Sequence, residues 1–394
     1  MNNRLEQRLD ELYAIGAQPD GGAYRGLYDD AWAQALDLVE RWFKDAGLKT
    51  RRDAVGNLWG RADGANKGKA VVTGSHIDTV RRGGRLDGAL GIISGLTAVE
   101  SLLKDGPPQR TLEVVAICEE EGSRFNTNFW GSRAIVGELD RVPDDIAAAM
   151  RARGLDAARV SSAARDDIDT FIELHIEQGA VLESAGTPLA VVSAIVGTAH
   201  LEVTVTGRPD HAGTTPMTLR RDALAAAAAM IQAVESIARA LGPPAVATVG
   251  RIRIEPDQMN VVPGRCMFTV DLRHSDLGAR RALEQRVRSL CQTIASERSL
   301  GLEMRVLQEK PPVAMHPDVR SLLARAARES GAHAMELVSG AGHDAQVLAA
   351  RCKVGMLFVP SIGGRSHCPE ESTKPEYLEL GTRVLQKALQ IIAY

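Results

Sequence analysis

Two periodicities alternate along this 394-residue chain. Residues 1–17 and 30–46 repeat apolar residues at helical spacing, and Gly47 ends the second stretch. From residue 48, short apolar strands alternate with helical stretches, an order typical of a sheet covered by helices. The segments expected here are strands Ala70–Thr73, Leu112–Ile117, Phe171–Leu174 and Leu189–Ile195, a helix over 88–104 and helical surface segments within 139–170.

The middle of the chain has a different order of elements, β-α-β-β-α-β, which is that of a split βαβ or ferredoxin-like unit. We place this inserted domain at 197–312. Its predicted elements are strand Leu201–Thr206, helix Thr218–Leu241, strands Ala245–Ile254 and Cys266–Leu272, helix 276–298 and strand Leu302–Leu307.

After two prolines at 311 and 312, the strand–helix alternation returns. The segments expected here are helix 317–330, strand 335–338, helix 344–350, strand 353–359 and helix 375–392. A chain of this length favours two domains over a single core. We therefore expect a discontinuous catalytic domain made of residues 1–196 and 313–394.

Composition and charge narrow the functional class. A net charge of −3 provides no electrostatic footprint for nucleic acid or an anionic membrane. The five cysteines are scattered without a CxxC pair, which favours a reducing compartment. The N-terminus reads as an amphipathic helix and the longest apolar run, 223–231, is shorter than a membrane span, so we expect a cytoplasmic protein.

Five potential metal ligands follow or end predicted strands: His76, Asp87, Glu121, His175 and His367. In an open α/β sheet, ligands bind outside the carboxyl ends of the strands. Three imidazoles and two carboxylates suit a pair of divalent cations such as Zn²⁺ or Mn²⁺. The pattern therefore predicts a metallohydrolase.

Two motifs suggest how these ligands are supported. In the segment GSHIDTV, alternation along the strand puts His76 and Asp78 on one side, so Asp78 could orient the imidazole. Asp87 lies in GGRLDGALG, a turn entering a helix, where its carboxylate could bridge two cations. A lone histidine or aspartate at a strand end is usually structural, but the two motifs together favour metal binding.

Three successive acids, Glu119, Glu120 and Glu121, follow a strongly apolar strand. Packed like charges repel, so the triplet is costly without a cation or proton to neutralise it. One acid should bind metal while a neighbour acts as general base toward water. The alternative, acids enriched at a helix N-terminus, explains one glutamate better than three.

These motifs, together with ELHIEQG, GRPDHAGTTPM, MNVVPG, DLRHSD, SGAGHDA and PSIGGRSHCPEE, resemble those of the hydantoinase/carbamoylase amidohydrolases of the M20 metallopeptidase-like superfamily. The resemblance runs from about residue 16 to the C-terminus. It implies an α/β fold, an aminopeptidase-like mixed sheet covered by helices, with an inserted α+β ferredoxin-like domain that serves as lid and dimerisation domain.

The resemblance also implies roles for the residues around the metals. His76 and His175 would bind one ion, Glu121 and His367 the second, and Asp87 would bridge the two. Glu120 would be the general base, with an exchange of roles with Glu119 as the alternative. The cofactors implied are two divalent ions per subunit, Zn²⁺, Mn²⁺ or Co²⁺.

Further residues are implied in substrate recognition. His211 would stabilise the oxyanion at the partner subunit's metals, and Arg273 would bind a substrate carboxylate with help from Asn260. Their structural alternatives are a surface hydrogen bond beside Asp210 for His211 and a strand-end salt bridge with Asp271 or Asp276 for Arg273. The remaining candidate pocket residues are Gln178, Gly342 and His343.

The implied activity is hydrolysis of the ureido C–N bond of N-carbamoyl-L-amino acids or allantoate, releasing amine, ammonia and carbon dioxide, by a homodimer. An aminoacylase or dipeptidase of the same fold, and a non-catalytic binding protein, are the alternatives. Arg81, Arg82 and Cys368 differ from the residues expected at their positions, so substrate preference does not follow from the resemblance.

Overall fold

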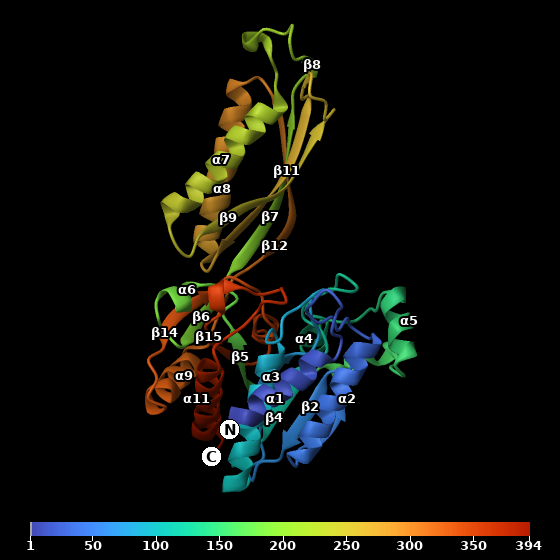
Figure 1. Cartoon of the computed structure of the whole chain (residues 1–394), viewed down its shortest axis with the longest axis vertical. Helices are drawn as coiled ribbons and strands as arrows, with labels where there is room; N and C mark the ends of the chain where they lie inside the picture. The colour runs from blue at the N-terminus through green and yellow to red at the C-terminus, as the bar shows by residue number, and fades with distance from the viewer. Residues whose placement is uncertain (1) are drawn as a thin grey trace. The chain divides into compact units, whose positions relative to one another are not determined.

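The computed structural model describes residues 2–394 and divides them into two compact units. The first unit runs up to Ser193 and resumes at Met315, and the second comprises Ala194–Ala314. The second unit is thus an insertion in the first, and its elements carry the yellow-green to orange colours of Figure 1.

The first unit is built on a mixed sheet with strand order β1-β2-β4-β3-β5-β15-β6, in which β14 also pairs with β6. The pairs β3–β4, β3–β5 and β5–β15 are parallel, whereas β1–β2, β2–β4 and β6–β15 are antiparallel. The predicted mixed α/β sheet is therefore confirmed. The strands are β1 (Lys49–Arg52), β2 (Leu58–Ala62), β3 (Ala70–His76), β4 (Leu112–Ile117), β5 (Ile168–Ile176), β6 (Ala190–Ile195), β14 (Met335–Ser339) and β15 (Lys353–Val359).

Helices cover this sheet. The α-helices are α1 (Asn2–Ala14), α2 (Asp30–Asp45), α3 (Ala89–Leu102), α4 (Trp130–Ile135), α5 (Asp144–Ala152), α6 (Val181–Ser184), α9 (Pro317–Glu329), α10 (Asp344–Leu348) and α11 (Pro375–Ala393), and the 3₁₀ turns are η1 (Leu103–Asp105), η2 (Ala157–Ala163) and η4 (Ile362–Gly364).

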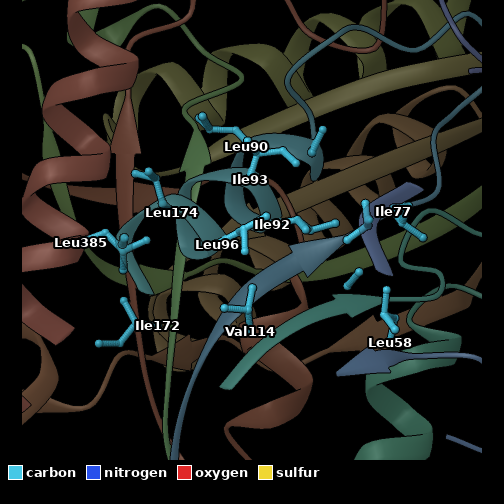
Figure 2. Packing of buried hydrophobic residues seen from close by; sticks show 14 of the residues in the cluster. Leu58, Ile77, Leu90, Ile92, Ile93, Leu96, Val114, Ile172, Leu174 and Leu385 are labelled. Atoms are coloured by element: carbon cyan, nitrogen blue, oxygen red, sulfur yellow. The ribbon is translucent and has the colours of Figure 1, made fainter. Parts of the chain in front are cut away.

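Helix α3 is the centre of the core. It is apolar on nearly all sides because it packs on β3, β4 and β5 and against α1 and α11. Figure 2 shows Leu90, Ile93 and Leu96 of α3 close to Leu174 of β5 and Leu385 of α11. This packing fixes the N-terminal end of α3, and with it the turn that carries Asp87.

The second unit is an antiparallel sheet of order β12-β7-β11-β9 with α7 and α8 packed against it. This is the β-α-β-β-α-β order that the sequence predicts. The elements are β7 (Gly197–Thr206), β8 (Asp210–His211), η3 (Met217–Leu219), α7 (Ala223–Leu241), β9 (Val246–Glu255), β10 (Val261–Val262), β11 (Arg265–His274), α8 (Leu277–Glu297), β12 (Gly301–Lys310) and β13 (Val313–Ala314).

Helix α7 differs from the prediction in the residue at which it begins and in the length of its predominantly apolar segment, which extends beyond 223–231. It begins at Ala223 rather than Thr218, because the carboxylate of Asp222 accepts a hydrogen bond from the amide of Ala225 and caps the helix there. By length and composition alone, α7 is apolar enough to cross a membrane. Its buried residues, which include Ala226 and Met230, belong to the core of the second unit.

Candidate metal centre and active site

The carboxyl ends of three parallel strands bring the first candidate residues together in the first unit. β4 and β5 flank β3, with His76 at the end of β3 opposite Ile117 of β4. The acids Glu119–Glu121 follow β4 directly, and His175 lies near the end of β5. Parallel strands end at one edge of a sheet, which is why segments about 100 residues apart in the sequence meet here.

Asp87 lies between two groups of ligand atoms. Its Oδ1 is 3.4 Å from Nε2 of His76 and 3.1 Å from Nε2 of His175. Its Oδ2 is 3.0 Å from Nε2 of His367, which is in turn 3.2 Å from Oε1 of Glu121. The five predicted ligands are therefore brought together, in two groups that share Asp87.

Asp78 joins the end of β3 to the acid triplet. Its Oδ1 lies 3.2 Å from Nδ1 of His76 and accepts a hydrogen bond from the backbone N–H of Glu120 at 3.0 Å. Its Oδ2 accepts one from the backbone N–H of Glu121 at 3.2 Å. The side chain of Asp78 thus orients the imidazole and also fixes the backbone of two neighbouring acids.

The imidazoles supply positive charge to this buried site. Burial lowers the pKa of His76, but hydrogen bonds to Asp78 and Asp87 outweigh it and raise the pKa well above the usual value. The pKa of His175 is raised by Asp87 against the effect of burial, and hydrogen bonds to Asp87 and Glu121 raise that of His367 to about 10. The carboxylates around these imidazoles thus favour positive charge at this position.

The acids show the complementary effect. Burial, with the charge of Asp78, raises the pKa of Glu119 to about 9. Burial and the charge of Glu121 raise the pKa of Glu120 well above its usual value. Burial also raises the pKa of Glu121, although the hydrogen bond to His367 opposes it. Imidazole nitrogens and carboxylate oxygens gathered this closely form a donor set that fits divalent cations, whose positive charge would relieve the repulsion between the acids.

The two candidates for the general base lie in different surroundings. Glu119 is fully buried, and its Oε2 accepts a hydrogen bond from the backbone N–H of Trp130 at the start of α4. Glu120 instead groups with His76 and Glu121, within reach of a common ion. This geometry favours Glu120 as the acid that faces the reacting centre.

The comparisons with known proteins decide the family. The model of peptidase family M20/M25/M40 matches residues 72–391. The chain belongs to this family. It is 39% identical to the allantoate amidohydrolase of Escherichia coli (strain K12), over 99% of this chain and 98% of the relative. It is 41% identical to the N-carbamoyl-L-amino acid amidohydrolase of Geobacillus stearothermophilus, over 97% of this chain and 96% of the relative.

Solved structures agree with this assignment. A hydantoinase/carbamoylase family amidase from Burkholderia ambifaria superposes with a TM-score of 0.94 at 36% identity, covering 100% of this chain and 98% of the other. The aminopeptidase PepT from Bacillus cereus, at 19% identity and a TM-score of 0.71 over 99% of this chain and 98% of the other, shares the fold. The predicted membership of the hydantoinase/carbamoylase amidohydrolases, enzymes that hydrolyse non-peptide C–N bonds, is confirmed.

The candidate pocket residues of the first unit lie beside two different members of the proposed ligand set, Asp87 and His175. Nε2 of Gln178 is 3.1 Å from Oδ2 of Asp87, while its buried Oε1 has no hydrogen-bond partner among the described residues. His343 packs edge-on against the candidate ligand His175, with ring centroids 4.6 Å apart, and is only 2% exposed. Together with Glu173, these two histidines form a further group whose ligand atoms lie close enough to hold an ion. Gly342 precedes His343 at the start of α10. Gln178 therefore faces the ligand groups, and His343 supports one of them.

The remaining candidates belong to the second unit. His211 of β8 pairs with Val261 of β10, next to Asn260, so these two candidates are neighbours. Nδ1 of His211 accepts hydrogen bonds from two backbone N–H groups at 3.0 and 3.2 Å, which leaves Nε2 as the donor of the neutral ring. Arg273 donates to Asp271, with Nη2 at 2.8 Å from Oδ2, so the salt bridge that competes with a substrate role is present in this structure.

The arginines that depart from the expected pattern contact the N-terminal segment. Nε of Arg82 is 3.3 Å from a carboxylate oxygen of Asp20, and the guanidinium of Arg81 stacks on the ring of Tyr24. The sulfur of Cys368 accepts a hydrogen bond at 3.5 Å from an arginine three residues before it. Contacts within the protein thus explain the presence of both arginines.

Two buried acids near the ligands are absent from the sequence-based set of site residues. Glu173 accepts a hydrogen bond from the hydroxyl of Ser75 at 2.6 Å, and Glu371 accepts hydrogen bonds from the turn that carries Asp87. Glu173 precedes His175 by two positions, so strand alternation could have placed both on one side. Only the fold brings Glu371 to that turn.

The metal-free protein should lose stability as the pH rises. The pKa of Glu119 is about 9 in the folded state and about 4.3 in an unfolded chain, so between these values the folded state binds more protons. The contribution of Glu119 to the free energy of unfolding is therefore greatest at about pH 4 and decreases as the pH rises toward 9. We expect the midpoint of urea unfolding to fall from pH 5 to pH 8, and to fall less in Glu119→Gln.

The control is Glu376→Gln, which removes an exposed carboxyl group. An unchanged slope in Glu119→Gln, equal to that of the control, would contradict the assignment of the raised pKa to Glu119.

Proposed function

We propose that this protein is a binuclear metal-dependent amidohydrolase that cleaves the ureido C–N bond of N-carbamoyl-L-amino acids or allantoate. The observation that carries the proposal is the position of Asp87, whose two carboxylate oxygens face separate groups of ligand atoms. The substrates of the similar enzymes from Escherichia coli and Geobacillus stearothermophilus support the choice of bond.

The grouping of the donor atoms supports a division of the proposed ligands between two ions. His76, His175 and Asp87 would hold one, and Glu121, His367 and Asp87 the other. Nitrogen and carboxylate oxygen donors suit Zn²⁺, Mn²⁺ or Co²⁺. When bound, such ions supply Lewis acidity toward the carbamoyl oxygen and the attacking water.

Glu120 has the position and the environment of a general base. It would take the proton from the attacking water and pass it to the nitrogen that leaves when the C–N bond breaks. Burial and the charge of Glu121 raise its pKa, so the ionised carboxylate is a stronger acceptor for the proton of water than an exposed glutamate is. For a substrate R–NH–CO–NH₂ and one water, the products are R–NH₂, ammonia and carbon dioxide.

Each unit carries residues that would take part in substrate recognition. The planar guanidinium of Arg273 suits a substrate carboxylate once it is released from Asp271, with Asn260 as a further donor. The unpartnered Oε1 of Gln178 is an acceptor suited to a ureido N–H. Gly342 and His343 would complete the wall of the pocket.

A comparison of substrates tests the bond that is cleaved. Ammonia release by metal-reconstituted enzyme should be detected for at least one of allantoate, N-carbamoyl-L-methionine and N-carbamoyl-β-alanine, with kcat/KM about tenfold or more above the other two, as for a site that discriminates by about 1.4 kcal/mol. Dipeptides and N-acyl amino acids serve as the control set. Turnover of the control set alone would assign an aminoacylase or dipeptidase instead. No turnover, with two ions bound, would favour a binding protein.

Replacement of the proposed base tests the mechanism. Glu120→Gln should lower kcat by about 10²–10⁴, because that is the contribution of a positioned acid–base group. Metal content, measured by mass spectrometry, should stay at the wild-type value, and Glu376→Gln should keep wild-type kcat. If Glu120→Gln retains more than about a tenth of kcat with both ions bound, Glu120 is not the base.

The second unit would act as lid and dimerisation domain, with residues 1–196 and 313–394 forming the catalytic domain of a cytoplasmic homodimer. In this arrangement Nε2 of His211 would donate to the oxyanion formed in the partner's site. The free N–H of its neutral ring supports that role.

Mixed dimers test whether His211 acts across subunits. Glu120→Gln and His211→Ala homodimers should each be nearly inactive. A dimer with one subunit of each kind has one site with both groups intact only if His211 serves its partner. Random mixing should then restore about a quarter of wild-type activity, since half of the dimers are mixed. Absence of recovery in purified mixed dimers, or a fully active monomer by light scattering, would contradict the role.

A further inference from the structure

Glu371 connects two segments that carry proposed ligands. Its Oε1 accepts hydrogen bonds from the backbone N–H groups of Leu86 at 2.8 Å and Asp87 at 3.0 Å. Its Oε2 accepts one from the hydroxyl of Ser366 at 2.7 Å. Glu371 is 5% exposed, so these three donors, rather than water, satisfy its carboxylate.

The turn before Asp87 is shaped to receive this carboxylate. A Cβ atom on Gly84 would lie 2.2 Å from Oε1 of Glu371 and 2.4 Å from its Cβ, so a side chain at this position would displace Glu371. The absence of a side chain at Gly84 lets the turn approach Glu371 closely. The N–H groups of Leu86 and Asp87 can then both donate to Oε1 of Glu371, which fixes the backbone that carries the Asp87 carboxylate.

On the other side, Glu371 holds the loop of His367. Ser366, its hydrogen-bond partner, directly precedes His367, and the backbone N–H of Glu371 donates to the carbonyl oxygen of Cys368 at 3.1 Å. His367 itself has a φ of 56°, a left-handed conformation that a residue other than glycine keeps when its surroundings impose it. The same glutamate therefore constrains the residues on both sides of this ligand.

We propose that Glu371 is a positioning residue of the metal centre: it sets the direction of the two Asp87 oxygens and holds His367 beside them. The proposal rests on the proposed binuclear site. Both carboxylate oxygens of Glu371 must accept hydrogen bonds in this role, because two N–H groups point at Oε1 and one O–H group points at Oε2. A glutamine can still accept from the two amides through Oε1, whereas an alanine leaves all three donors without this partner.

The test compares Glu371→Ala, Glu371→Gln and the control Glu370→Ala. Glu370 is the exposed neighbour that pairs with Arg365. The first readout is the affinity for Zn²⁺, measured by competition with a chromogenic chelator in the absence of substrate. We expect Glu371→Ala to bind at least one Zn²⁺ about 10–100-fold more weakly, the range for the loss of a group that orients metal ligands. Glu371→Gln should regain most of that affinity, and Glu370→Ala should equal the wild type.

The second readout is hydrogen exchange of the backbone amides of Leu86 and Asp87 in the metal-free protein, which does not depend on the proposed activity. Exchange at both amides should be faster in Glu371→Ala and nearly unchanged in Glu371→Gln. This measurement separates the role of Glu371 from the proposed function, because it holds even if the substrate is not a ureido acid.

The proposal would be overturned if Glu371→Ala keeps wild-type Zn²⁺ affinity. If the unfolding temperature is lower while the affinity is unchanged, Glu371 stabilises the fold only. If Glu371→Ala does not fold, Ser366→Ala removes the link through Oε2 and leaves the two amide links through Oε1. It also removes the contacts of the hydroxyl with Oδ2 of Asp87 at 3.4 Å and with Nε2 of Gln178 at 3.2 Å. We then expect weaker Zn²⁺ binding with unchanged exchange at Leu86 and Asp87, and wild-type affinity in Ser366→Ala would overturn the link to His367.

Discussion

The structure of the site depends on one electrostatic constraint, the burial of several carboxylates at one sheet edge. Buried like charges raise each other's pKa unless counter-charges or hydrogen-bond donors compensate them. Asp87 shows the compensated case, because hydrogen bonds from His175, His367 and His76 hold its pKa well below the usual value in spite of burial. Glu120, for which Glu121 is a repelling neighbour, shows the opposite case. The pKa values of two acids in one site are thus shifted in opposite directions by their surroundings.

Backbone amides provide the second part of the compensation. Asp78 accepts from the N–H groups of Glu120 and Glu121, and Glu371 accepts from those of Leu86 and Asp87. In both cases at least one of the donating N–H groups belongs to a residue that itself presents a carboxylate: Glu120 and Glu121 toward Asp78, and Asp87 toward Glu371. The same hydrogen bonds therefore compensate a buried negative charge and fix the backbone of a proposed ligand. This accounts for buried acids at this edge, such as Asp78 and Glu371, that are not themselves proposed ligands.

Much of the fold, and the set of residues that meet at this edge, could be predicted because their signals are local. Apolar strands that end in His76 or precede Glu119 identify both the strand and the end at which polar groups gather, and the family motifs propose which of these groups are ligands. Other features depend on contacts that sequence patterns do not contain. The carboxylate of Glu371 meets an amide 284 residues away, and the ring of His343 packs edge-on against that of His175, with 4.6 Å between the centroids. The pairing of Arg273 with Asp271 was one of two possibilities that only coordinates can distinguish.

The position of β15 has a consequence for how the protein is made. It is the last strand in the chain, yet it lies inside the sheet, between β5 and β6. When a ribosome has synthesised β1 to β6, the strand that lies between β5 and β6 in the final sheet is therefore still missing. His367 follows β15, so the donor group that it shares with Glu121 and Asp87 also forms last. A nascent chain truncated before this strand lacks both a closed sheet and a complete set of ligands, which makes the site a feature of the finished polypeptide only.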